Sequence, residues 1–181
     1  MDRTIALIDG INEWIGRAAG VLALAMAVAM LAVVVLRYLF SMSFPWLSES
    51  VLYLHGLVFM LGIAYTLRHG GHVRVDVIQR QRSQRTRAWI EITGTVLFLW
   101  PVALFLLVMN LPYVEAAWRI HEGAREPGGI PYLYLLKTLL IVMPILLMLQ
   151  GLAELLRAWR SLAGGEGIES DGPVHEAEEG P

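Results

Sequence analysis

Runs of uncharged apolar residues that match the thickness of a bilayer constrain this chain most. No residue carries a fixed charge from 18 to 36, from 51 to 67 or from 92 to 111, and 130–152 holds a single one. About 20 apolar helical residues cross the roughly 30 Å of a hydrocarbon core. Lipid leaves unpaired backbone groups unsatisfied, which favours helices. We therefore predict an all-α integral membrane protein, a four-helix bundle with spans at about 18–36, 47–67, 92–111 and 130–152.

The amino-acid composition excludes several classes of function. The 181 residues are 56% hydrophobic and only 17% charged, and none is cysteine; soluble domains average about 25% charged residues. Disulfides and thiolate chemistry are excluded, and no basic stripe supports nucleic-acid binding. The chain also lacks the common local motifs of nucleotide-binding, hydrolytic and calcium-binding sites. We expect a protein that is not an enzyme, with no cofactor, no metal and no nucleic-acid partner.

Three regions are predicted along the chain. Apolar and charged residues alternate with helical spacing over residues 1–17, which predicts an amphipathic helix that lies in the membrane interface and continues into the first span. A docking surface for a partner is the alternative. Residues 18–163 form the membrane domain, and its first apolar run is too long for a cleaved signal peptide. Residues 164–181, rich in Gly, Glu and Pro, are predicted to be disordered.

Arginine and lysine predict the orientation. Ten of the fourteen lie in the N-terminal segment, in the loop from Arg68 to Glu91 and after the fourth span. Three lie in the two connections on the other side, and Lys137 is the remaining one. Because positive residues stay on the cytoplasmic side, we predict that both termini are cytoplasmic.

Three ionisable residues in or beside the spans are candidates for function. His55 lies near the middle of the second span, where an ionisable group suggests function; we favour a neutral imidazole hydrogen-bonded to another helix. Lys137, in the fourth span, either reaches outward to the interface or meets a partner's carboxylate or an anionic lipid. Glu49 opens the second span, where it either complements the positive helix end or contacts a partner.

Two histidine-based cofactor sites can be weighed. His69 and His72 have the spacing of a metal pair, but two glycines lie between them and Asp76 is the only carboxylate nearby, so a loop that ends the second span is the better interpretation. A b-type haem held by His55 would need a second histidine at similar depth. No other predicted span contains one. In the third span, the pair Trp100-Pro101 predicts a kink.

Several segments together resemble one transporter family. They are Arg37-Tyr38, Trp46-Leu47-Ser48-Glu49, Gly62 to Arg68, the Gly71-His72-Val73-Arg74-Val75-Asp76 junction, Glu126 to Pro131, and Lys137. In order and spacing they resemble the small transmembrane (DctQ-like) subunit of tripartite ATP-independent periplasmic (TRAP) transporters, over roughly residues 9–160. Members commonly have an aromatic residue in the middle of the second span, where this chain has His55. The Tyr-Leu-His segment at 53–55 and the Gly-His-Val-Arg-Val-Asp segment at 71–76 are most similar to the branch of the family associated with oxo-acid and aromatic-acid uptake.

The resemblance implies a bacterial inner-membrane protein with two protein partners. One is a large multi-span permease subunit that holds the substrate and sodium sites, and the other is a periplasmic substrate-binding protein that delivers an organic acid. This chain would be the scaffold, in contact with membrane lipids, and the motif residues would face partners. Two alternatives remain open from the residues alone, a membrane anchor of a respiratory or other membrane complex and an autonomous small membrane bundle.

Overall fold

The computed structural model describes residues 2–70, 84–124 and 126–163. Its elements are, in chain order, α1 (Asp2–Leu39), α2 (Pro45–Arg68), α4 (Gln84–Gly94), the π-helical turn η1 (Thr95–Leu99), α5 (Trp100–Arg119) and α6 (Leu133–Ala163). Because α4, η1 and α5 follow one another without a break, the described residues contain four helices long and apolar enough to cross a membrane. The predicted all-α fold with four spans is confirmed, and no residue in the described ranges is in a strand.

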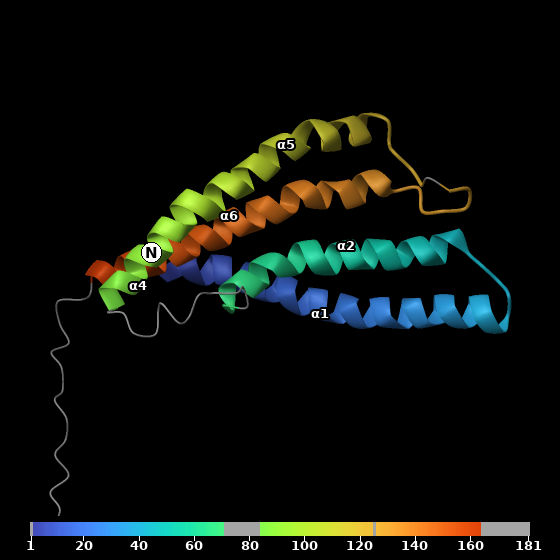
Figure 1. Cartoon of the computed structure of the whole chain (residues 1–181), viewed down its shortest axis with the longest axis horizontal. Coiled ribbons are helices and arrows are strands. Elements are labelled where there is room, and N and C mark those ends of the chain that lie inside the picture. Colours follow the sequence, from blue (N-terminus) through green and yellow to red (C-terminus); the bar gives the residue numbers. More distant parts are fainter. Residues whose placement is uncertain (1, 71–83, 125, 164–181) are drawn as a thin grey trace, which may run out of the picture.

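The long helices pack as two hairpins (Figure 1). α1 lies beside α2, and α5 lies along α6. α6 also contacts α1, α2 and α4, so it joins the two hairpins. We call the end of the bundle that holds the start of α1 and the end of α6 the termini end. The opposite end, which holds the α1–α2 and α5–α6 connections, is the loop end.

α1 extends well beyond the first predicted span. It is 38 residues long, about 57 Å at 1.5 Å per residue, which is nearly twice the hydrocarbon thickness. Ile5, Ile8 and Asn12 are buried in this extension, at 8%, 7% and 1% exposure, whereas Trp14 is 73% exposed. Residues 2–17 therefore continue into the first span as predicted, and one of their faces packs inside the bundle. Their position in the membrane interface stays a prediction.

The third long helix accommodates Pro101 without ending. The turn before it, η1, is π-helical, and the backbone N–H of Trp100 donates to the carbonyl of Thr95, five residues back. Proline has no N–H to donate and its ring crowds the preceding turn, so a wider turn at this point relieves the conflict. The structure thus has a π-helical turn on the N-terminal side of Trp100-Pro101, and the predicted kink stays a prediction.

The same helix continues past the predicted end of the third span. The apolar run ends at Leu111, but α5 passes through Pro112 and ends at Arg119. Val114 and Ala117 in the added turns are buried, at 3% and 2% exposure. Packing of these side chains stabilises turns that the apolar run alone did not predict. The end of the apolar run at Leu111 is where the segment suited to lipid ends, and α5 continues beyond it to Arg119.

Small residues set the distance between neighbouring helices. A Cβ on Gly16 of α1 would overlap the ring of Tyr65 on α2, and a Cβ on Gly56 of α2 would lie 2.8 Å from Leu136 Cδ1 on α6. Ala64 is completely buried. Because lipid tails are as apolar as the helices, close van der Waals packing of this kind is a main source of association between spans.

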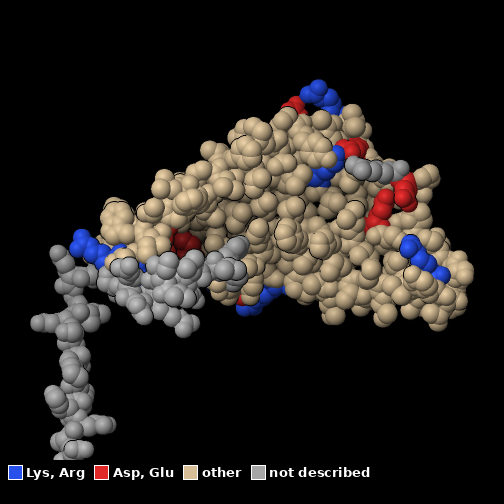
Figure 2. Space-filling view, in the orientation of Figure 1, with Lys and Arg blue, Asp and Glu red and all other residues tan. Residues whose placement is uncertain are grey.

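Charged side chains lie at the two ends of the bundle. On the face shown in Figure 2, blue and red atoms lie toward the termini end, at one place on the lower edge and around the loop end, and the broad area between them is tan. This distribution is the one expected of a bundle whose middle contacts lipid, because a fixed charge is costly there.

Candidate functional site

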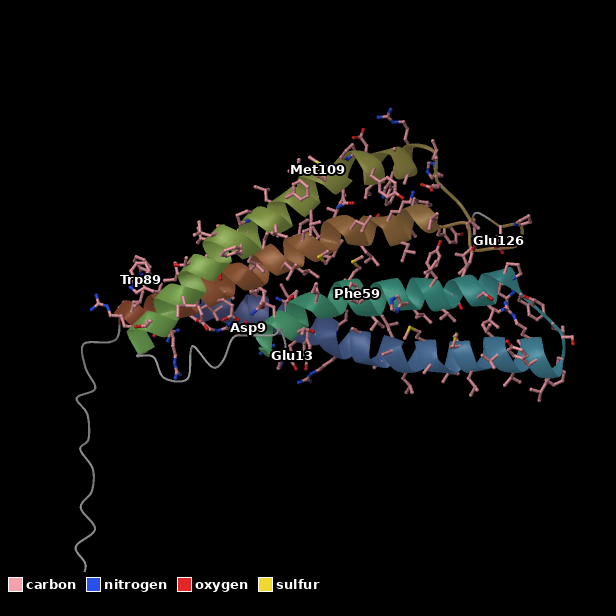
Figure 3. All side chains as sticks on the ribbon, in the orientation of Figure 1. Asp9, Glu13, Phe59, Trp89, Met109 and Glu126 are labelled. Carbon is pink, nitrogen blue, oxygen red and sulfur yellow. The ribbon has the colours of Figure 1, made fainter. Side chains whose placement is uncertain are left out.

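Polar residues from three helices meet at the termini end. We call them the termini cluster: Asp9, Asn12 and Glu13 from α1, Arg68 from α2, and Gln150, Glu154 and Arg157 from α6. Asp9 and Glu13 are labelled where these helices approach one another in Figure 3. The cluster fixes the crossing of the two hairpins.

Two arginines of the termini cluster bridge between helices. Arg157 donates to Asp9 on α1 and, at 2.7 Å, to Glu154 on its own helix. Arg68 donates to Glu13 Oε2 at 2.7 Å and to the Asp9 backbone carbonyl at 2.8 Å. The three carboxylate side chains are only 15–25% exposed. Each arginine thus donates hydrogen bonds to two acceptors of the termini cluster.

A buried amide pair lies on the bundle side of these ion pairs. Asn12 Nδ2 donates to Gln150 Oε1 at 2.6 Å, and the two residues are 1% and 0% exposed. Gln150 Nε2 in turn donates to Glu154 at 3.2 Å. The sequence did not predict this pair, since its members are 138 residues apart. The available signal was a polar side chain on the apolar face of each helix.

Glu49 anchors the start of α6 at the loop end. Its Oε2 accepts a hydrogen bond from the backbone N–H of Ile130 at 2.5 Å. Tyr53 donates to the carbonyl of the same residue at 3.4 Å. Gly129 lies so close that a Cβ there would be 2.5 Å from the Glu49 carboxylate. Glu49 therefore has a structural partner in its own chain, and contact with another protein through it stays a prediction.

Lys137 is also paired within the chain. Its Nζ donates to Glu122 in the α5–α6 connection and lies 4.1 Å from the ring centroid of Tyr113. The lysine side chain is only 11% exposed. The group that Lys137 meets is thus a carboxylate of its own chain. The predicted reach to the outer interface, or to a partner's carboxylate or an anionic lipid, stays a prediction. The sequence could not show that the connection folds back over it.

A cavity of about 540 Å³ opens between the start of α2, the end of α5 and the start of α6. Its lining is mostly apolar, with two tyrosines and three charged residues: Glu49, Tyr53, Tyr113, Glu126 and Lys137. Glu49 and Lys137 are already hydrogen-bonded inside the chain. The cavity lies at the loop end, and the elements that line it place it away from the middle of the bundle.

His55 is exposed on α2, with its ring 6.3 Å from that of Phe59 and nearly parallel to it. It makes no hydrogen bond with any described residue, and the predicted bond to another helix stays a prediction. No group of three His, Asp or Glu side chains that could hold a metal occurs among the described residues. The chain turns this imidazole outward.

The other predicted site residues are dispersed. Arg37 and Trp46 are exposed near the α1–α2 connection, and a Cβ on Gly62 would meet open space. Pro131 packs beside Gly123 in the α5–α6 connection and follows Ile130, whose backbone N–H donates to Glu49. Three motif residues lie outside the described part of the chain: His72, Arg74 and Asp76.

Comparison with known proteins gives one family. The family model described as "Tripartite ATP-independent periplasmic transporters, DctQ component" matches residues 10–161, which include all four long helices apart from their outermost turns. Neither the curated proteins nor the solved structures contain a significant match.

Proposed function

Because the chain belongs to the DctQ component family of tripartite ATP-independent periplasmic transporters, we propose that it is the scaffold for a large permease subunit in sodium-coupled uptake of an organic acid. Proteins of this family are the small permease subunit of such transporters. In our proposal the large subunit carries the substrate and sodium sites in the bacterial inner membrane. A periplasmic protein delivers the acid, and residues 1–17 lie in the membrane interface.

The placement of polar groups supports the scaffold role. Coupling sodium to an anion takes unwound helix ends and a polar pocket near the midplane. In the described residues the long helices pass through the middle of the bundle without a break, and their irregular points are the turn η1 and the prolines inside α5 and α6, Pro112 and Pro144. The cavity of about 540 Å³ lies at the loop end. The buried Asn12 and Gln150 side chains are hydrogen-bonded to each other between α1 and α6. Polar groups that hold the bundle together suit a rigid support.

Reconstitution tests this proposal. We expect proteoliposomes that contain only this chain to neither bind nor take up the acid. The complete system should transport it in a sodium gradient, and omission of this chain should abolish uptake while the periplasmic protein still binds ligand. Sodium-dependent uptake by the chain alone would make it the transporter, and full uptake without it would make it dispensable. Either result ends the scaffold proposal.

The proposed orientation gives a separate prediction. Reporter fusions after Arg85 and after Leu162 should read cytoplasmic, because ten of the fourteen basic residues lie on that side. A fusion after Arg125 should read periplasmic. Alkaline phosphatase and a fluorescent protein, used in parallel at each position, give signals of opposite sign and control for expression. A periplasmic signal after Arg85 would contradict both termini being cytoplasmic.

A further inference from the structure

α2 presents a narrow exposed stripe. Between Val51 and Arg68 its exposed residues are Leu52, His55 and Phe59, which follow one another at helical spacing and therefore share one face. Leu52 and Phe59 are 56% and 60% exposed. Phe59 is labelled on this helix in Figure 3. The remaining positions of this part of α2 are at least half-covered by α1 and α6, which pack against it.

The polar member of this stripe lies at mid-depth. His55 is the eleventh of the 24 residues of α2, which places its Cα about 2 Å from the middle of the helix axis. The hydrocarbon extends about 15 Å to either side of the midplane. A histidine side chain is too short to reach the headgroups from there, so it cannot be satisfied by the interface as a lysine can.

A neutral imidazole has one N–H donor and one acceptor nitrogen. The ring of Phe59 stacks on His55 but offers neither an acceptor nor a donor in the ring plane. No described residue of this chain supplies one. Acyl chains supply none either, and an unpaired polar group in hydrocarbon is costly. Lipid therefore leaves the donor and the acceptor of His55 unpaired, and a polar group of another protein can pair with them.

We propose that the Leu52–His55–Phe59 stripe docks a transmembrane helix of the large permease subunit, which hydrogen-bonds to His55 through a polar side chain. This inference rests on the proposed function. Members of the family are a component of a tripartite transporter, and in the proposed function one of the other components is a permease subunit with membrane spans. Further along α2, a Cβ on Gly62 would meet open space, and this leaves room for close approach of the incoming helix, as small residues do between spans.

Photo-crosslinking in membranes tests the surface. p-Benzoylphenylalanine at Phe59 should crosslink to the large subunit. Phe105 is the matched control, because it is an aromatic residue near the middle of the continuous helix Arg85–Arg119 and is 61% exposed against 60% for Phe59. It should give no protein crosslink. Crosslinks from Phe59 to a second copy of this chain or to lipid only would overturn the proposal, as would equal crosslinking from Phe105.

Substitution of His55 tests the hydrogen bond. His55→Leu should reduce the large subunit retained in a mild-detergent pull-down about threefold, the size expected for one such bond between spans, and His55→Gln should retain it. Equal retention of the large subunit by the unaltered chain, His55→Leu and His55→Gln would show that His55 forms no such bond. Because His55 is exposed, an unchanged elution profile should confirm the fold of each variant. If the unaltered chain itself recovers no large subunit, both the proposed function and this inference fail. If the unaltered chain recovers the large subunit but Phe59 gives no crosslink to it, only this inference fails.

Discussion

Arg157→Met is expected to lower the free energy of unfolding by about 3 kcal/mol, measured by SDS titration of the purified chain in mixed micelles. Arg157 bridges Asp9 and Glu154, whose side chains are 18% and 15% exposed. Removing it leaves Glu154 without its cation and leaves Asp9 with only the longer contact to Arg68 Nε, at 3.7 Å. Losing one partner of a fully buried ion pair costs about 3–5 kcal/mol, and the 34% exposure of the arginine side chain places this case at the low end.

Arg17→Met is the matched control. Arg17 pairs with Glu13 at 3.0 Å one helical turn away, but its side chain is 77% exposed. Exposed pairs of this spacing contribute about 0.3–0.5 kcal/mol, so this variant should be nearly as stable as the unaltered chain. Adding Asp9→Asn to Arg157→Met should recover part of the loss, because it removes one of the two carboxylates that lose Arg157. Equal stability of the two single variants would show that the termini cluster does not hold the helices together.

Gly16→Leu is expected to destabilise the bundle by about 3 kcal/mol in the same assay, at the upper end of the usual cost of overpacking. A Cβ on Gly16 would overlap the Tyr65 ring and lie 2.8 Å from Tyr65 Cβ. The root of the Tyr65 side chain cannot move aside without moving α2. The larger residue must therefore separate α1 from α2, which forfeits packing along the whole hairpin.

Gly20→Leu provides the comparison on the same helix. A Cβ there meets nothing within 4 Å, and Gly20 is exposed. Leucine favours a helix over glycine by roughly 0.5–1 kcal/mol, so this variant should be neutral or slightly more stable. A loss of stability with Gly20→Leu equal to that with Gly16→Leu would mean that the contact with Tyr65 is not what the substitution disturbs.

The sequence alone determined the helices and their number, since a single apolar segment pairs all its backbone groups within itself when it is a helix, and four apolar runs had the length to cross lipid. It also singled out two residues at the loop end that the structure brings to one cavity, Glu49 and Lys137. These signals are local. Hydropathy is read within one segment, and an ionisable group inside an apolar run is visible without knowing its neighbours.

Only the tertiary structure decided which polar groups meet. Arg157 reaches Asp9 across 148 residues, and Lys137 finds Glu122 because the connection folds back over it. Pairing of this kind depends on which helices are neighbours and on how each is rotated about its axis, and hydropathy specifies neither. The same rotation left His55 facing outward. Whether a polar residue in a span is satisfied by its own chain or left for a partner is set by packing, because the covalent sequence fixes the residue but not the direction it faces.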